Sequence, residues 1–303
     1  MLKNKFLVIE TLNQELHFLI LDLKLIAVLE LKDAILMLRF RILRSLFLTS
    51  NIPRSKSIKY KFKESNLLKE KGFIILPKLK DSLVKNLITQ YKSNCERSFG
   101  KDYNEVIKDL QKNNKIRGAF CNLMPSVEIA GIIKEVLPIV QDSLQVSRDR
   151  IRIRLMCDTL IAPKNKKIYK ERWLSGYDDA LRFHRDFDGL RFLKYFIYLS
   201  DCDKDKGAHY LVKGSAQKRF LDGCGPGARF DKNEILRHFN EDSIKIFEGP
   251  KGFNFLEDTN NFHAGSIPKK GGRILLTLEF MDFKSARLKS FYAPFICMNL
   301  LDG

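Results

Sequence analysis

Short apolar runs separated by turn residues fill the second half of the chain. The clearest runs are FLKYFIYL at 192–199, HYLV at 209–212, GFNFL at 252–256 and RILLTLEF at 273–280. Before them, Ile151 begins a segment in which apolar and basic residues alternate with period two, which is typical of a half-buried strand. The pattern therefore predicts a series of short strands after residue 150.

The pattern before residue 150 is mainly helical. A helical segment ends at Gly72, a strand covers 73–76 and stops at Pro77, and Asp81 is expected to cap a helix that extends to about Tyr91. Further helical patterns cover residues 103–111 and 127–144. Helices followed by many short strands predict an α+β fold, in which an antiparallel sandwich or jelly roll carries helices on one side.

The N-terminal segment, residues 1–44, is apolar enough to resemble a membrane span. Charged residues such as Asp22 and Lys24 interrupt it, so no uncharged stretch approaches the roughly 20 residues that cross a bilayer. We expect a long helix that is covered by the main domain, a second subunit or a membrane surface, and the second case would give a homo-oligomer. Pro, Ser and Asn at 49–57 indicate a boundary. The predicted domains are an N-terminal helical extension (1–50) and a main domain (55–303).

The composition is that of a folded globular protein with a basic surface. The chain has 303 residues, of which 45% are hydrophobic, and a formal net charge of +18, so it can bury a core and would attract anionic partners. Its 6 cysteines are scattered, without a C-x-x-C pair, which predicts neither a zinc knuckle nor a disulfide framework and favours a reducing, cytoplasmic location. Charge alone does not choose among nucleic acid, an acidic membrane surface and a phosphorylated substrate.

The sequence FHRDF at 183–187 contains the first candidate metal ligands. In an extended strand His184 and Asp186 lie on the same face, while Arg185 points away. His263 follows in EDTNNFHAG, at the far end of a strand and its turn. Two histidines and one carboxylate form the ligand set of non-haem iron(II) oxygenases, although a tetrahedral zinc hydrolase could use similar ligands.

Arg273 discriminates between these two interpretations. It begins a strand after the turn KKGG at 269–272. A guanidinium there can pair bidentately with the distal carboxylate of a dicarboxylic cosubstrate whose other end chelates the iron. By strand alternation Thr277 shares the face of Arg273, and it is expected either to line the same pocket or to pack as a buried strand residue.

Several segments in order along the chain resemble the phytanoyl-CoA dioxygenase-like family of iron(II)- and 2-oxoglutarate-dependent oxygenases. KGFIILPKLKDSLVKNL resembles the opening strand and helix of that family, and FHRD resembles its H-x-D motif. LSDCDKDKGAHYLVKGSAQKR is similar to a segment with an acidic turn, a glycine and a Gly-Ser pair usually followed by His, which Ala216 replaces here. GFNFLEDTNNFHAGSIPKKGGRILLTLEF resembles the closing strands. The resemblance covers about residues 66–283.

This resemblance implies a fold, a site and a reaction. The fold would be a double-stranded β-helix, a cupin-like jelly roll, with flanking helices. The iron(II) ligands would be His184, Asp186 and His263. Arg273 would anchor 2-oxoglutarate, and because Gly265 stands where the family often has serine, Ser266 is expected to help hold the cosubstrate carboxylate. The implied reaction is hydroxylation of a small molecule, with release of succinate and CO2.

Two other functions stay open on the sequence alone. A nucleic-acid oxygenase of related fold would suit the positive charge, but it needs a basic groove with stacking aromatics, and Glu279 stands where such enzymes are expected to carry a second arginine. A catalytically silent scaffold could associate through the N-terminal helix. Either an anionic substrate or an ordinary charged sheet face would explain Arg152, Arg154, Arg182 and Arg185. His209, within HYLV, is expected to be structural.

Overall fold

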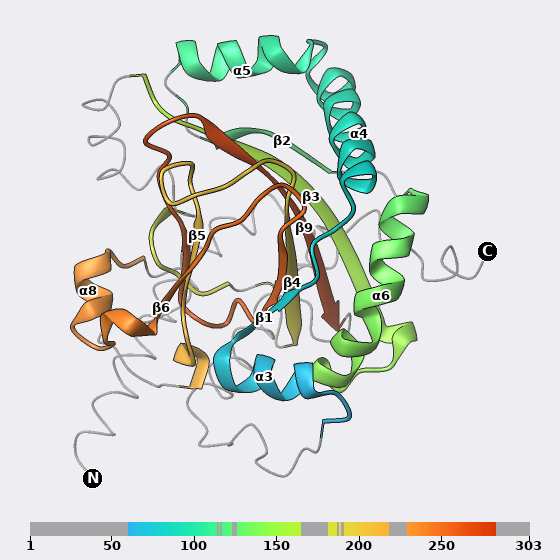
Figure 1. Ribbon diagram of the computed structural model, residues 1–303, viewed down its shortest axis with the longest axis vertical. Coiled ribbons are helices and arrows are strands. Elements are labelled where there is room, and N and C mark those ends of the chain that lie inside the picture. The colour runs from blue at the N-terminus through green and yellow to red at the C-terminus, as the bar shows by residue number, and fades with distance from the viewer. Residues whose placement is uncertain are drawn as a thin grey trace, which may run out of the picture.

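The chain is seen in a computed structural model (Figure 1). The described residues are 60–113, 115, 117–122, 126–164, 181–186, 188, 191–217 and 229–282. The predicted N-terminal helix and the boundary at 49–57 lie outside them. None of the helices within the described ranges is both long and apolar enough to cross a membrane.

Most of the helices precede most of the strands along the described chain. The α-helices are α3 (Lys63–Lys71), α4 (Asp81–Phe99), α5 (Tyr103–Lys112), α6 (Val127–Leu144) and α8 (Lys232–Leu236). Short 3-10 helices cover Arg148–Arg150, Ser215–Gln217 and Glu241–Ser243. The strands are β1 (Phe73–Leu76), β2 (Arg117–Asn122), β3 (Ile151–Ile161), β4 (Phe192–Tyr198), β5 (His209–Val212), β6 (Ile244–Phe247), β7 (Asn254–Glu257), β8 (His263–Gly265) and β9 (Gly272–Asp282).

The described strands form two antiparallel sheets. The larger sheet has the order β1-β7-β4-β9-β3-β2 and the smaller has the order β6-β5-β8. β3 and β9 pair over their whole length, from Ile151 opposite Asp282 to Ile161 opposite Gly272. Phe255 of the larger sheet stacks on Phe247 of the smaller, with ring centroids 3.9 Å apart. The two sheets therefore face each other, and their inward-pointing side chains share one interior space.

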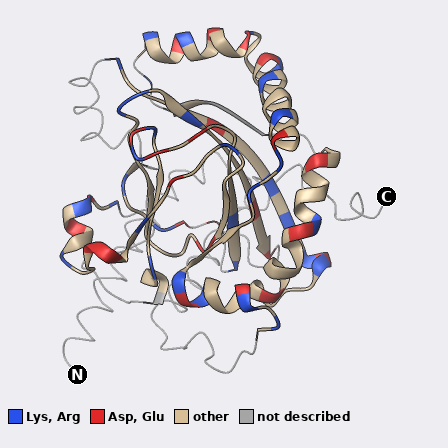
Figure 2. Cartoon of the chain, in the orientation of Figure 1, with Lys and Arg blue, Asp and Glu red and all other residues tan. Residues whose placement is uncertain are grey.

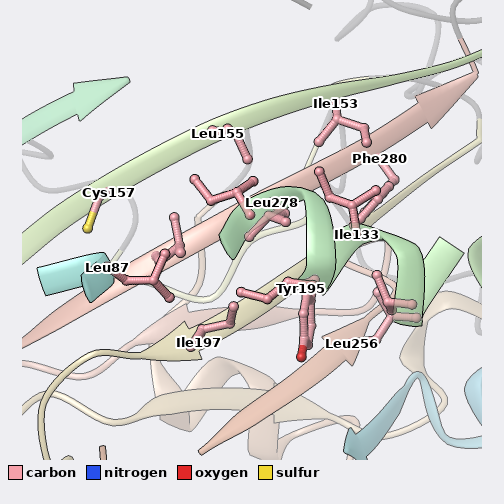
Figure 3. Packing of buried hydrophobic residues seen from close by; sticks show 14 of the residues in the cluster. Leu87, Ile133, Ile153, Leu155, Cys157, Tyr195, Ile197, Leu256, Leu278 and Phe280 are labelled. Atoms are coloured by element: carbon pink, nitrogen blue, oxygen red, sulfur yellow. The ribbon is translucent and has the colours of Figure 1, made fainter. Parts of the chain in front are cut away.

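Helices cover the other face of the larger sheet. The buried apolar residues of α6 recur every three or four positions, which gives the helix one apolar stripe: Ile129, Ile132, Ile133, Val136, Leu137, Val140 and Leu144. Leu87 of α4 and Ile133 of α6 pack with Ile153 of β3 and with Leu278 and Phe280 of β9 (Figure 3). Burial of each such side chain contributes about 1.5–3 kcal/mol, so this layer is the main core.

The helix predicted from Asp81 needs two corrections. Lys80 is its N-cap residue, and Asp81 is the first helical residue, whose carboxylate accepts a hydrogen bond from Lys78 Nζ at 3.0 Å. The helix also extends to Phe99 and not only to about Tyr91. It is longer because Cys95 is fully buried and continues the apolar stripe by one more turn.

The other predicted elements mostly occur where the patterns place them. The strands at 73–76 and 209–212 and the helix at 127–144 have the predicted ends. β2, β6 and β8 escaped prediction because short strands show too little periodicity. His263 follows strand β7 and its turn, as expected, and it is also the first residue of the short strand β8. The mixed class, with helices on an antiparallel sheet, is confirmed.

Candidate metal centre

Two segments that run side by side bring the candidate ligands together. The backbone N–H of His184 donates to the carbonyl oxygen of His263 at 2.9 Å, and the reverse bond has the same length. The N–H of Asp186 then donates to the carbonyl oxygen of Thr259 at 3.0 Å. These bonds align the FHRD segment antiparallel to β8, so the positions of all three side chains are set by backbone pairing.

Both histidines are oriented through Nδ1. That atom lies 2.8 Å from the carbonyl oxygen of Arg182 in His184, and 3.0 Å from the carbonyl oxygen of Asn261 in His263. A carbonyl can only accept, so each Nδ1 carries the proton, and the lone pair of Nε2 is available to a metal. His184 and His263 are 6% and 5% exposed, which keeps these nitrogens away from bulk water.

The carboxylate of Asp186 lies between the two imidazoles. Its Oδ1 is 3.5 Å from Nε2 of His184, and its Oδ2 is 3.4 Å from Nε2 of His263. Nζ of Lys194, on β4, donates to the same Oδ2 at 2.7 Å and to Oδ2 of Asp188 at 2.9 Å. Lys194 therefore holds one carboxylate oxygen in place while the other is directed toward His184.

The electrostatics of the cluster follow from burial and from these contacts. Burial would raise the pKa of Asp186, but Lys194 and the imidazoles outweigh it and hold that pKa well below its usual range. Burial, with a contribution from His263, lowers the pKa of His184 to about 4. Asp186 raises the pKa of His263 despite its burial. The cluster thus supplies an ionised carboxylate and a neutral imidazole at His184.

One ligand atom from each of His184, Asp186 and His263 lies within 4.8 Å of the other two. Such a spacing allows all three to bind a single ion. The mixed nitrogen and oxygen donors suit a divalent transition metal, and a three-residue set on one side leaves coordination positions open to other ligands. The residues therefore fit a metal of this kind.

Arg273 supplies a second charged feature in the same interior. It is 5% exposed, and its guanidinium carbon lies 5.7 Å from the ring centroid of Tyr198. Neither Nε nor Nη1 has a hydrogen-bond partner among the described residues. A buried guanidinium with unmet donors is costly, and the planar pair of N–H groups matches a carboxylate. The residue fits an anionic ligand bound beside it.

The residue before Arg273 allows β9 to reach this position. A Cβ atom built on Gly272 would lie 2.0 Å from the carbonyl oxygen of Leu160 on β3. Any other residue would therefore push β9 away from β3 at the point where Arg273 enters the interior.

Comparison with known proteins identifies the fold. No protein-family model matches the sequence, and no curated protein sequence is significantly similar to it. The structure is similar to that of EctD from S. alaskensis in its apo form, with a TM-score of 0.52 and 15% identity over 78% of this chain and 87% of that chain. The chain has the fold of EctD.

A second structure of EctD gives the same result. EctD with bound 2-oxoglutarate and 5-hydroxyectoine matches with a TM-score of 0.51 and 15% identity over 78% of this chain and 80% of that one. EvdO2 from Micromonospora carbonacea var. aurantiaca, complexed with 2-oxoglutarate, has a TM-score of 0.47 and 13% identity over 74% and 91%.

The other two residues predicted to contact the cosubstrate lie on β9 and immediately after β8. Thr277 is 7% exposed on β9 and pairs in register with Phe196, on the same strand face as Arg273. Ser266 follows β8, and its N–H donates to the carbonyl oxygen of Ala208 at 2.8 Å. The backbone N–H of Ala216 donates to Oδ1 of Asn261 at 2.8 Å, the residue whose carbonyl oxygen orients His263.

The arginines predicted to meet an anionic substrate have partners within the protein. Arg185 points away from the cluster, as expected, and its guanidinium donates to the carbonyl oxygen of Ser215 at 2.7 Å. Arg154 forms an ion pair with Glu279 at 2.5 Å. Arg182 lies 3.8 Å from Glu234. These contacts favour a structural role for the three arginines.

From the sequence alone we did not identify Lys194, which bonds Asp186, or Glu257, which pairs with His209. Lys194 is the only charged residue within β4 (FLKYFIY), and that isolated charge in an apolar run was the available signal. His209 was expected to be structural, and Glu257 drew no attention. In the structure Nε2 of His209 lies 2.9 Å from Oε2 of Glu257, and its ring stacks on His263 with centroids 5.6 Å apart.

Proposed function

We propose that the protein is a non-haem iron(II)- and 2-oxoglutarate-dependent dioxygenase that hydroxylates a small molecule and releases succinate and CO2. One observation carries the proposal: a His-Asp-His cluster and a buried arginine with unmet N–H donors lie in the same interior. A hydrolytic zinc site can act without such an arginine, because its nucleophile is a metal-bound water. A dicarboxylic cosubstrate needs both features, one for each of its ends.

In this proposal His184, Asp186 and His263 hold iron(II), and Arg273 binds the distal carboxylate of 2-oxoglutarate. When bound, the iron supplies activation of O2, coupled to oxidative decarboxylation of the cosubstrate. The chain's own residues bind and orient: the carbonyls at Arg182 and Asn261 keep each Nε2 available. Asp186 fills the third protein position, which leaves no place for a halide ligand and favours hydroxylation over halogenation.

Further parts of the proposal concern the pocket and the fold. Ser266 and Thr277 are proposed to contact the cosubstrate beside Arg273. We also propose that the two facing sheets form a double-stranded β-helix of the phytanoyl-CoA dioxygenase-like type. The likeness to EctD supports the fold. A cytoplasmic location and association through the N-terminal helix stay predictions.

A small-molecule substrate is favoured over nucleic acid. A nucleic-acid groove concentrates cations along one surface. On α3, α4, α5, α6 and α8 the Lys and Arg residues are mixed with Asp and Glu (Figure 2). Glu279, in the position expected to hold a second arginine, is buried and paired with Arg154. Both observations argue against a basic groove along the described elements.

Anaerobic titration of the purified full chain with iron(II) and then 2-oxoglutarate tests this function. We expect a visible charge-transfer band that appears only when both are present, because the band needs a chelate of the two. His184→Ala should abolish the band. His238→Ala, a substitution of the same kind beyond the end of α8, should leave it intact. Under air, the wild-type protein should release succinate even without its substrate.

Each alternative has a distinct outcome in this experiment. Wild-type protein that neither forms the band nor releases succinate is not a 2-oxoglutarate oxygenase. Failure to bind iron(II) at all would support the catalytically silent scaffold. Salt-sensitive binding of DNA or RNA, with 2-oxoglutarate turnover, would move the substrate class to nucleic acid.

A further inference from the structure

His209 lies beside both parts of the proposed site. It is 4% exposed on β5, and its ring stacks on that of His263 with centroids 5.6 Å apart and an interplanar angle of 22°. Its backbone N–H donates to the hydroxyl of Tyr198 at 3.0 Å. The ring of Tyr198 in turn lies 5.7 Å from the guanidinium of Arg273. The imidazole is therefore next to a proposed metal ligand and to the ring that contacts the proposed carboxylate anchor.

A buried carboxyl group orients this imidazole. Nε2 of His209 lies 3.2 Å from Oε1 and 2.9 Å from Oε2 of Glu257, which is fully buried on β7. The rings of Phe196, Phe247 and Phe255 surround His209, with centroids at 4.8, 5.8 and 5.5 Å. Within the described residues, Nδ1 has no hydrogen-bond partner. Nε2 is therefore held by Glu257, the Phe rings offer no hydrogen-bond partner, and Nδ1 is available to a ligand.

The pair of His209 and Glu257 makes Nδ1 a donor. If the two groups share one proton between Nε2 and the carboxyl oxygens, then Nδ1 carries an N–H whichever atom holds the shared proton. The pair is then neutral as a whole, and it does not repel a dicarboxylate. Glu257 is fully buried, and no Lys or Arg among the described residues forms an ion pair with it, so an uncharged carboxyl costs less than an ionised one in this shell.

We propose that His209, oriented by Glu257, is a cosubstrate-binding residue whose Nδ1–H donates to 2-oxoglutarate in the interior between His263 and Arg273. This inference rests on the proposed function, because it needs the same cosubstrate. It assigns a role to the ring nitrogen of His209 that does not face Glu257. The role is binding, so affinity for the metal alone should not depend on Nδ1.

Two substitutions separate this role from a purely structural one. The amide nitrogen of asparagine reaches about the position of Nδ1, and the amide of glutamine reaches about the position of Nε2. His209→Asn therefore keeps a donor for the cosubstrate and loses the contact with Glu257. His209→Gln keeps the contact with Glu257 and loses the donor at Nδ1. The dissociation constant for 2-oxoglutarate is measured anaerobically from the charge-transfer band, and that for Mn(II) alone by calorimetry.

We expect His209→Gln to weaken 2-oxoglutarate binding roughly 10- to 100-fold, as for loss of one hydrogen bond to a charged group. His209→Asn should stay within about threefold of wild type, and Mn(II) affinity should be unchanged in both. Glutamine binding 2-oxoglutarate as tightly as wild type, or both variants weakening it equally, would overturn the proposal. If wild type forms no band, the proposed function itself fails, which is a different result.

A measurement on the wild-type protein covers the case in which neither variant folds. The chain has only 5 histidines, so selective ¹⁵N-histidine labelling gives a sparse spectrum. In protein loaded with diamagnetic Zn(II), addition of 2-oxoglutarate should shift an Nδ1–H signal of a histidine that does not bind the metal. Absence of any such shift at saturating 2-oxoglutarate would contradict the proposal.

Discussion

Strands β4 and β9 present one face to the helices and the other to the interior between the sheets, and the two faces carry different chemistry. The helix-facing side is apolar, with Tyr195 and Ile197 on β4 and Leu278 and Phe280 on β9. The inward side of the same strands carries buried polar residues. These are Lys194 on β4 and Arg273, Thr277 and Glu279 on β9. Stability and chemistry are thus divided between alternate residues of the same strands.

The apolar face must offset the free-energy cost of the charged groups on the inward face. Ionised groups in an interior cost free energy unless each has a partner. Lys194 forms ion pairs with three carboxylates, those of Asp186, Asp188 and Glu279. Glu279 also pairs with Arg154, whereas Arg273 keeps unmet donors within the described residues. The unpaired cation is the feature that a stability argument does not explain, so it is where ligand binding is expected.

Removal of the Lys194 ammonium group should produce the largest change in the free energy of unfolding. Lys194→Met leaves the carboxylates of Asp186 and Asp188 without their ammonium partner, and we expect the free energy of unfolding to fall by about 3–5 kcal/mol in metal-free protein. Mn(II) should restore part of this loss, because a bound cation replaces the missing charge. Urea unfolding with and without Mn(II) measures both effects. Lys251→Met, at an exposed lysine, is the control, and equal losses in the two variants would refute the expectation.

A cavity on the helix-facing side should also destabilise the protein, but it should leave ligand binding unchanged. Leu278→Ala removes a fully buried side chain, and we expect a loss of about 2–5 kcal/mol. The folded variant should bind iron(II) and 2-oxoglutarate as wild type does. Val127→Ala, at a side chain that is 87% exposed, should change stability by less than about 0.5 kcal/mol. Weaker 2-oxoglutarate binding in folded Leu278→Ala would mean that the two faces are not independent.

Most of the fold could be predicted from local patterns. The helix at 127–144 has a clear apolar stripe, and the strands at 73–76 and 209–212 are bounded by turn residues. Pairing between distant strands is not encoded in any short window, so the order of the larger sheet and the existence of β8 could not be read from the sequence. The predicted end of α4 was wrong because Cys95 is buried only by tertiary packing, which the local pattern does not show.

Part of the candidate site could likewise be predicted from local patterns. His184 and Asp186 could be found because their spacing places them on one strand face, and Arg273 because it follows a turn into a strand. Lys194 carried a signal as an isolated charge in an apolar run, whereas His209 and Glu257 carried none, because polar residues in strands usually face water. These side chains share one interior only because β4 pairs with β7 and β9 and because the smaller sheet lies opposite.

Arg273 itself should affect the cosubstrate and not the metal. Arg273→Met removes the guanidinium but keeps much of its apolar volume, and we expect 2-oxoglutarate binding to weaken about 100-fold, or about 2.7 kcal/mol. Titration of the charge-transfer band gives this value, and Mn(II) calorimetry should show no change. The control is Arg150→Met, which breaks the ion pair with Asp282 at the far end of β9. Unchanged 2-oxoglutarate affinity in Arg273→Met would remove the proposed anchor.

The smallest effect is expected when a threonine is replaced by valine on each of the two faces. Thr277→Val deletes an inward hydroxyl beside the proposed cosubstrate, and loss of one neutral hydrogen bond should weaken 2-oxoglutarate binding about three- to tenfold. Thr159→Val deletes a hydroxyl on the helix-facing side of β3, which bonds the hydroxyl of Tyr91 at 2.8 Å. It should lower the melting temperature and leave 2-oxoglutarate affinity unchanged. If Thr277→Val also changes only the melting temperature, then Thr277 is a packing residue, and the ligand-binding part of the inward face is confined to its charged groups.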